Sequence, residues 1–308
     1  MNILKWSAFL PIFLFFTSTV CLGQNLSIGE DRQLFLDDYI IESKDDLSEC
    51  LNLPRNEGPV FYFDKPWEGN FSAYCTIIQD GEQFRAYYRG IRDAGSDGRE
   101  AETTCVAFSE DGIHWTKPSL GIYDVDGSRD NNVILAHAAP VTHNFSPFID
   151  KNPDCKPEER YKAIGGTKKS GLIAYYSADG IHWNKYQDQA VFTEGLFDSQ
   201  NVAFWSESEQ QYICYFRIWT EVGYNGYRSV GRTTSSDFLH WTPAEAMTFG
   251  NTPMEHLYTQ QTSPYFRAPQ IYVAIGARFM PDRQVLSEEQ AKALDVNPKY
   301  FKDCSDAI

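Results

Sequence analysis

A seven-residue pattern that occurs three times constrains the fold more than any other feature of the sequence. It reads Ser-Glu-Asp-Gly-Ile-His-Trp at 109–115 and Ser-Ala-Asp-Gly-Ile-His-Trp at 177–183, and a divergent copy, Ser-Ser-Asp-Phe-Leu-His-Trp, occupies 235–241. Similarity that recurs along a chain in this way is the signature of a repeated supersecondary unit. The chain is therefore expected to build its core by packing several similar units against one another.

Short segments rich in aromatic and β-branched residues precede each copy of the pattern, and such segments are typical of strands. They occupy residues 84–88 and 103–108 before the first copy, 161–164 and 172–176 before the second, and 212–216 and 230–234 before the third. A helical pattern stands out only at 287–294. The sequence therefore predicts an all-β fold made of repeated antiparallel sheets.

The side chains of the repeated pattern have structural explanations. An Asp in a turn accepts backbone N–H groups two residues on, Gly tolerates a positive φ, and Trp fills the space between neighbouring sheets. A four-stranded sheet closed by such a turn is a β-propeller blade. We therefore interpret His114, His182 and His240 as parts of the scaffold rather than as catalytic residues.

The Ser-x-Asp-x-x-x-Trp turn resembles the turn that closes each blade in the five-bladed propellers of glycoside hydrolase families 43, 32, 68 and 130. The segment Leu-Phe-Leu-Asp-Asp-Tyr-Ile-Ile at 34–41, with Pro-Trp-Glu-Gly at 66–69, is similar to a bacterial group often labelled family-32-like. The resemblance covers residues 30–308. It implies hydrolysis of glycosidic bonds in a poly- or oligosaccharide. A non-catalytic carbohydrate-binding propeller is the alternative, and a phosphorolytic or sialidase-like reaction is a third interpretation.

The number of repeats predicts an incomplete propeller. Three turns mark three blades, and a fourth blade is expected to begin near 262–267 and to continue through 271–276. Five blades at this repeat length would need about a hundred further residues. We therefore expect an incomplete five-bladed β-propeller, with about three and a half to four blades present.

The N-terminal residues 1–23 have the organisation of a signal peptide, and residues 24–308 are predicted to form the propeller domain. Lys5 supplies the positive start, residues 6–16 are apolar, and Cys21-Leu-Gly23 offers small residues before a cleavage point. The protein is therefore expected to be secreted or periplasmic, and lipid attachment through Cys21 is the alternative. No later stretch of the sequence is apolar enough to suggest a membrane span.

The charge of the chain excludes several classes of partner. A net charge of −15 and a pI near 4.8 disfavour nucleic acids and anionic membranes, which bind clustered Lys and Arg. No Cys pair has CxxC spacing and no nucleotide-binding, GxSxG or HExxH motif is present. We therefore expect a carbohydrate substrate, no metal, no cofactor and no protein partner.

Glycoside hydrolysis needs two carboxyl groups beside the scissile bond. In a propeller, the residues just before the innermost strands converge on one end of the central channel. Glu68, Asp198 and Glu255 are the acidic residues at such positions. The resemblance implies that Glu68 is the base or nucleophile and that Asp198 or Glu255 is the acid. The chain departs from the family pattern, because Glu68 stands where an Asp is usual.

The predicted substrate-binding residues surround the same positions. Arg89, Arg217 and Arg278 each follow an equivalent apolar strand, which suggests a ring of guanidinium groups that keeps the inner acids ionised or binds the carboxylate or sulfate of a sugar. Trp67 is a candidate platform for stacking a sugar ring. The remaining candidates are His143, Asn144, Gln200 and His256.

Overall fold

The structure, a computed structural model, describes residues 27–35, 37–50, 52–69, 71–93, 95–294 and 306–307. The predicted signal peptide at 1–23 lies outside these residues. The chain divides into two units, Met1–Asn52 and Leu53–Ile308. In the first unit, Lys44 pairs with Asp38 and Glu49. No helix of the described residues is both long and apolar enough to cross a membrane.

The second unit consists of four successive antiparallel sheets, which we call blades 1 to 4. Blade 1 contains β1 (Ala73–Asp80), β2 (Gln83–Gly90), β3 (Thr103–Ser109), β4 (Trp115–Thr116) and β5 (Val133–Leu135). Blade 2 contains β6 (Ser146–Ile149), β7 (Tyr161–Thr167), β8 (Gly171–Ser177) and β9 (Asn184–Lys185). Blade 3 contains β10 (Val202–Ser206), β11 (Gln211–Glu221), β12 (Asn225–Ser235) and β13 (Glu245–Ala246). Blade 4 contains β14 (His256–Tyr265), β15 (Ala268–Met280) and β16 (Asp306–Ala307).

Short helical segments connect these strands. Two 3₁₀ turns, η1 (Val141–His143) and η2 (Pro157–Glu159), flank β6, and α1 (Glu288–Ala293) follows β15. Ser287 begins α1 with a capping box, in which its hydroxyl accepts from Gln290 N and the Gln290 side chain accepts from Ser287 N. The regular secondary structure of the described residues is therefore almost entirely β, as the sequence predicts.

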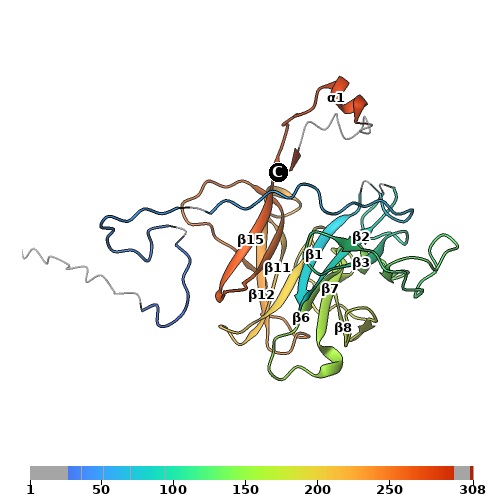
Figure 1. Cartoon of the computed structure of the whole chain (residues 1–308), viewed down its shortest axis with the longest axis horizontal. Coiled ribbons are helices and arrows are strands. Elements are labelled where there is room, and N and C mark those ends of the chain that lie inside the picture. The colour runs from blue at the N-terminus through green and yellow to red at the C-terminus, as the bar shows by residue number, and fades with distance from the viewer. Residues whose placement is uncertain are drawn as a thin grey trace, which may run out of the picture. The chain divides into compact units, whose positions relative to one another are not determined.

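The first strands of the four blades, β1, β6, β10 and β14, lie innermost and surround a common axis. Neighbouring inner strands contact one another in chain order, and all four line a cavity of about 600 Å³. Hydrogen bonds also cross this channel: Gln200 Nε2 donates to Thr76 Oγ1 at 2.7 Å, and Gln261 Nε2 donates to the Cys75 carbonyl at 2.9 Å. Figure 1 follows the blades from the cyan β1 to the orange-red β15. The arrangement is a β-propeller, which confirms the predicted fold class.

The three copies of the repeated turn have the same hydrogen bonds. The first Ser hydroxyl accepts from the backbone N–H three residues on at 2.9 Å, and the Asp Oδ1 accepts from the His backbone N–H at 2.8 Å. The indole of each Trp donates to the carbonyl three residues before it, at 3.0, 3.2 and 3.0 Å. The turn therefore joins the third and fourth strands of a blade, as the sequence predicts.

The divergent third copy replaces Gly with Phe238 although the position keeps a φ of 70°, close to the 74° of Gly112 and Gly180. A side chain at positive φ is strained unless its surroundings stabilise it. Phe238 is fully buried and packs against Phe148 of blade 2 and Tyr212 of blade 3. The apolar burial of the ring offsets the backbone strain and joins the two blades.

Replacement of Asp237 by Asn is expected to lower the melting temperature by about 2–4 °C, because loss of a side chain that caps backbone N–H groups costs about 1 kcal/mol. Burial acts to raise the pKa of Asp237, but hydrogen bonds from the His240 ring and from the backbone lower it to about 2, from 3.8. The depressed pKa means that the carboxylate stabilises the fold above about pH 4 and loses this effect as the pH falls through about 2.

Melting curves recorded between pH 2 and pH 7 check this expectation. The difference between the wild type and Asp237→Asn should be full at neutral pH and should shrink progressively as the pH falls below about 4 toward 2. Glu110→Gln, an exposed substitution beside the first turn, should melt like the wild type throughout. A difference that is the same at pH 2 and pH 7 would contradict the assignment.

Candidate functional site

One end of the channel gathers ionisable and aromatic side chains, which we call the charged cluster. The inner strands all begin at this end, β2 and β11 return to it, and β12 starts from it. Residues near these strand ends therefore meet although they are far apart in the sequence. The charged cluster consists of Tyr74, Arg89, Asp97, Glu102, His143, Asp198, Arg217, Arg228 and Tyr258.

Asp198 forms an ion pair with Arg217, with Oδ1 at 3.0 Å from Nη1. The Arg217 side chain is only 6% exposed, and its other terminal nitrogen donates to the Tyr258 carbonyl. Asp198 is held in place by Phe197, which has a φ of 55° and is buried in the core of blade 3. The carboxylate stays 29% exposed, so it is both fixed and accessible.

Tyr74 connects Asp198 with blades 1 and 2. It has a φ of 53° and lies where the register between β1 and β2 shifts. Its ring lies beneath the guanidinium of Arg89 at 4.7 Å and contacts His143 edge-on at 5.6 Å, and its hydroxyl donates to the Asp198 carbonyl at 3.3 Å. Burial, together with the nearby Tyr258, raises the pKa of Tyr74 to about 12 against the lowering effect of Arg89 and Arg217. The hydroxyl is therefore a hydrogen-bond donor at neutral pH.

His143 and Glu102 form a buried dyad, 1% and 2% exposed. His143 Nδ1 lies 3.1 Å from both Glu102 oxygens and 3.0 Å from Arg89 Nη1, so the carboxylate favours a proton on Nδ1 and the guanidinium favours one on Nε2. With either tautomer, Nε2 has no hydrogen-bond partner among the described residues, and the nearest acid is Asp97 at 3.8 Å. Nε2 is therefore a buried, unpartnered polar atom beside the exposed side chain of Asp97.

Three other predicted binding residues make their hydrogen bonds within the protein. Asn144 is fully buried, and its Nδ2 donates to the carbonyls of Gly166, Phe197 and Ser199 at 2.9, 2.5 and 2.8 Å. Gln200 bonds to Thr76 and Gln261 across the channel. His256 Nδ1 accepts from the backbone of Arg228 at 3.1 Å, and burial and that guanidinium lower the pKa of His256. These contacts join different blades, and roles in substrate binding stay predictions.

The structure does not bring Glu68 into the charged cluster. Glu68 Oε1 accepts from the Tyr88 hydroxyl at 2.6 Å, and Oε2 lies 2.6 Å from Lys117 Nζ. Successive residues of a strand point to opposite faces of the sheet. Because Arg89 contacts His143 of blade 2, Tyr88 and its partner Glu68 lie on the other face of blade 1. The catalytic role predicted for Glu68 is untested, but its contacts are those of a buried structural ion pair.

Glu255 and Arg278 pair with each other rather than with the charged cluster. Glu255 Oε2 lies 2.5 Å from Arg278 Nη2, and the two side chains are 38% and 50% exposed. Of the three arginines in the predicted ring, Arg89 and Arg217 lie in the charged cluster and Arg278 does not. The third arginine of the cluster is Arg228.

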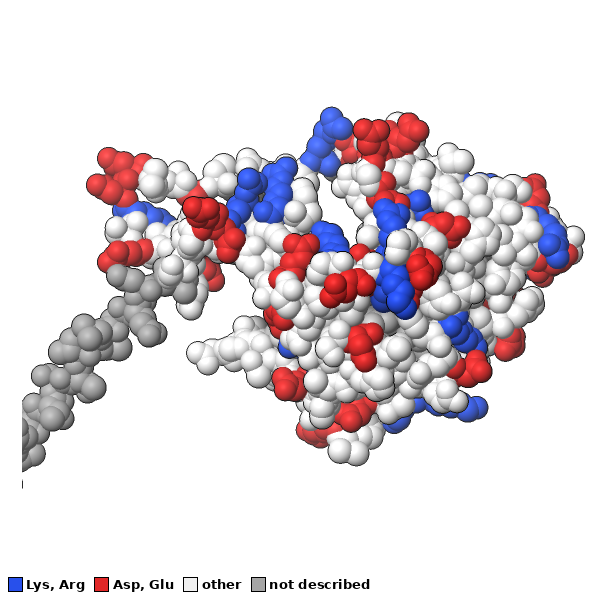
Figure 2. Space-filling model, turned by 90° about the horizontal axis from the view of Figure 1, so that it is seen from below, with Lys and Arg blue, Asp and Glu red and all other residues white. Residues whose placement is uncertain are grey.

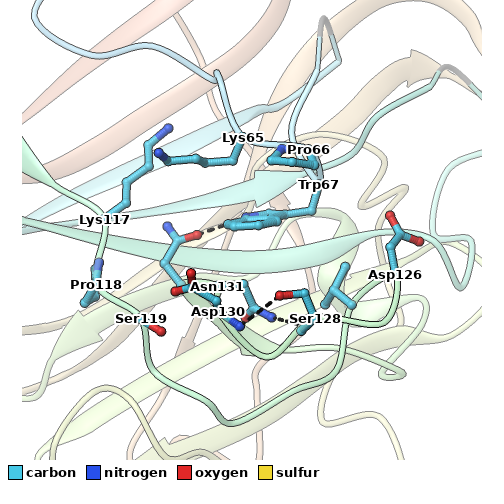
Figure 3. Close-up of a pocket in the computed structure, with 12 residues that line it drawn as sticks. Lys65, Pro66, Trp67, Lys117, Pro118, Ser119, Asp126, Ser128, Asp130 and Asn131 are labelled. Atoms are coloured by element: carbon cyan, nitrogen blue, oxygen red, sulfur yellow. Dashed lines mark hydrogen bonds between the residues drawn. The ribbon is translucent and has the colours of Figure 1, made fainter.

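Trp67 lines a hollow of about 520 Å³ on blade 1. Its indole N–H donates to Asn132 Oδ1 at 2.9 Å, which fixes the ring. Figure 3 shows the indole between Lys65 on one side and Asn131 on the other. The ring has the surroundings of a stacking platform, and its predicted contact with sugar remains a prediction.

Sequence reasoning missed five members of the charged cluster. Asp97 and Glu102 lie in the loop between β2 and β3, where nothing in the sequence marks an acid that faces the channel. Arg228 lies in β12, outside the repeated position that carries the other arginines. Tyr74 and Tyr258 lie near the starts of β1 and β14, so a search for aromatic residues at these positions would have found them.

The described residues contain no group of three or more His, Cys, Asp or Glu side chains arranged to hold a metal ion. Ion pairs, buried hydroxyls and an unpartnered imidazole nitrogen instead supply the chemistry of the charged cluster. Fold and site together define a β-propeller with a polar, partly accessible channel end.

No family model matches the chain, and no curated protein matches it. Solved structures that resemble it include an N-acetylgalactosamine deacetylase from F. plautii, at 14% identity and a TM-score of 0.43, covering 72% of this chain and 70% of that chain. A fructofuranosidase from Schwanniomyces occidentalis is 15% identical with a TM-score of 0.44, covering 72% of this chain and 43% of that chain. An α-L-arabinanase from Cellvibrio cellulosa is 11% identical with a TM-score of 0.43, covering 77% of this chain and 84% of that chain. At these values, the likeness assigns no activity.

Replacement of Glu68 by Gln is expected to destabilise the protein by about 2–3 kcal/mol, because it leaves the buried Lys117 ammonium without its closest carboxylate. Urea unfolding measures this change. The double variant Glu68→Gln, Lys117→Met should recover part of the loss, because it removes an ammonium that the exposed Asp64, at 2.9 Å, would be left to neutralise alone. Unchanged stability in Glu68→Gln, together with loss of turnover, would instead support the catalytic role predicted from the sequence.

Proposed function

We propose that this protein is an exported glycoside hydrolase that cleaves glycosidic bonds of a poly- or oligosaccharide at the charged cluster. The observation that carries the proposal is the Asp198–Arg217 ion pair at the channel end, in contact with Tyr74 and accessible from outside. The resemblance of the repeated turns to those of glycoside hydrolase propellers supports the same class of reaction. The N-terminal segment predicted to be a signal peptide supports export.

Asp198 is proposed as the ionised carboxylate of the reaction. A guanidinium at 3.0 Å balances its charge, and the exposed part of the side chain leaves room for a sugar or an attacking water. In the two-carboxylate mechanisms, the ionised group acts as a base on water or as a nucleophile on the anomeric carbon.

Asp97 is proposed as the second carboxyl group, which protonates the leaving oxygen. Its side chain is 59% exposed, lies 3.8 Å from His143 Nε2, and is close enough to Tyr74 to raise the pKa of that hydroxyl. Tyr74 therefore lies near both Asp97 and Asp198. Its hydroxyl is proposed to bind a sugar hydroxyl beside the two acids.

Replacement of Asp198 by Asn should lower kcat/KM by about a thousandfold or more, and Asp97→Asn by about a hundredfold, within the range for loss of an acid, base or nucleophile. New reducing ends released from a panel of oligosaccharides measure turnover, and circular dichroism checks folding. Glu207→Gln is the matched control, because Glu207 lines the opposite part of the channel.

Full turnover by Asp198→Asn would rule out the proposed site. Saturable binding of an oligosaccharide by the wild type, with no product after prolonged incubation, would favour the carbohydrate-binding propeller instead. Loss of turnover in Glu255→Gln but not in Asp97→Asn would move the proton donor to Glu255.

A further inference from the structure

Three guanidinium groups lie in the charged cluster of a chain whose net charge is −15. Acidic and basic side chains are interspersed on the face in Figure 2. Of these three guanidinium groups, by contrast, only Arg217 pairs with a carboxylate. Across the described stretches between residues 27 and 294, neither Arg89 nor Arg228 forms an ion pair with an acid. Two of the three guanidinium groups in the charged cluster therefore form no direct ion pair.

Aromatic rings hold Arg228 in place. Its guanidinium lies 4.3 Å from the Phe279 ring centroid, 4.7 Å from that of Trp219 and 5.7 Å from that of Tyr258. Contacts of this kind stabilise a cation and fix its plane, but they accept none of its N–H groups in a hydrogen bond. Arg228 Nε is buried without a partner, and the two terminal nitrogens form no hydrogen bond with the described residues. The rings thus orient the guanidinium while its terminal donors remain unpaired.

The surroundings of Arg228 favour an anion. Burial and the neighbouring Arg217 cation lower the pKa of Arg228. Two like charges this close to each other are unfavourable, and an anion bound beside them relieves the repulsion. Guanidinium groups bind carboxylate and sulfate oxygens through paired, charge-assisted hydrogen bonds.

The adjacent hairpin favours a sugar as the carrier of that anion. Strands β11 and β12 are 11 residues long, and their connecting end carries Tyr224 and Tyr227, which are 46% and 41% exposed. Trp219 contacts Tyr224, and Tyr227 contacts His256. An exposed aromatic ring presents a flat apolar face, and the apolar face of a sugar ring can stack on it. An inorganic anion alone would not need this surface.

We propose that the substrate is an acidic glycan, bearing a uronate or sulfate group, and that Arg228 binds this group beside the Tyr224–Tyr227 end of the β11–β12 hairpin. The inference rests on the proposed function, since it names the substrate class of the same channel end. Arg89 and Arg217 complete the cationic side of the site, and Asp198 faces the bond to be broken.

An array of neutral, uronate-containing and sulfated oligosaccharides tests the proposal with the full chain. The wild type should bind acidic glycans at least about tenfold more tightly than neutral glycans of the same length, and Arg228→Gln should remove this preference. Arg228→Lys should retain part of the preference, because it keeps the charge but not the paired donors. The anion is identified by whether the protein binds the uronate-containing or the sulfated oligosaccharides of the array.

Arg232→Gln is the matched control. Arg232 lies in the same strand and pairs with Glu209 at 2.5 Å, outside the charged cluster, so this variant should bind acidic glycans like the wild type. Binding only to neutral glycans, no binding to any glycan, or an unchanged preference in Arg228→Gln would overturn the proposal. Melting curves of all variants show whether Arg228→Gln is folded, and Arg228→Lys tests the same contact if it is not.

Release of products from the bound glycans separates the two proposals. Tight acidic binding without any product would contradict the hydrolase and leave the acidic ligand standing. Cleavage of neutral glycans that is lost in Asp198→Asn but unaffected in Arg228→Gln would support the hydrolase and contradict the acidic substrate.

Discussion

The packing of aromatic rings between neighbouring blades is the interaction on which the rest of the structure depends. Trp183 of blade 2 contacts Phe145 edge-on at 5.0 Å and Tyr87 of blade 1 at 6.5 Å, and Phe238 of blade 3 contacts Phe148 of blade 2 at 5.5 Å. Rings of this size each bury about 150–250 Å² and prefer edge-to-face geometry, so they fix the angle between two sheets as well as holding them together. These angles decide where the inner strands meet, and the channel follows from them.

The fold could be predicted from the sequence because its signal is local. The hydrogen bonds that recur in all three turns join residues within the seven-residue pattern, so the pattern can be read without knowledge of distant contacts. The third copy shows the limit of this reading. Phe238 occupies a positive-φ position where the other two copies have Gly. It is stabilised by packing against Phe148 in the core between blades 2 and 3, and this contact cannot be read from the sequence.

The site was only partly predictable because it depends on which face of a strand a residue occupies and on loops between strands. Glu68 and Asp198 both precede an inner strand, yet Glu68 pairs with Lys117 inside blade 1 and Asp198 pairs with Arg217 at the channel end. A one-residue change of register moves a side chain to the opposite face. Position relative to a strand selected His143 and Arg89, which contact each other in the charged cluster, but it could not separate a structural acid from an accessible one or find Arg228.

The channel end combines features that do not favour stability. Tyr74 and Phe197 adopt left-handed backbone conformations, His143 Nε2 is buried without a partner, and Arg228 lies near a second cation. Strained backbone and unpartnered polar atoms each cost on the order of 1–3 kcal/mol, and they persist where the surrounding structure compensates. In this propeller the compensation comes from the blade interfaces, where Phe197 itself packs against Phe192 and Phe216. Because the blade interfaces stabilise the scaffold, the channel end can keep unpaired charges and strained backbone conformations that a bound ligand would stabilise.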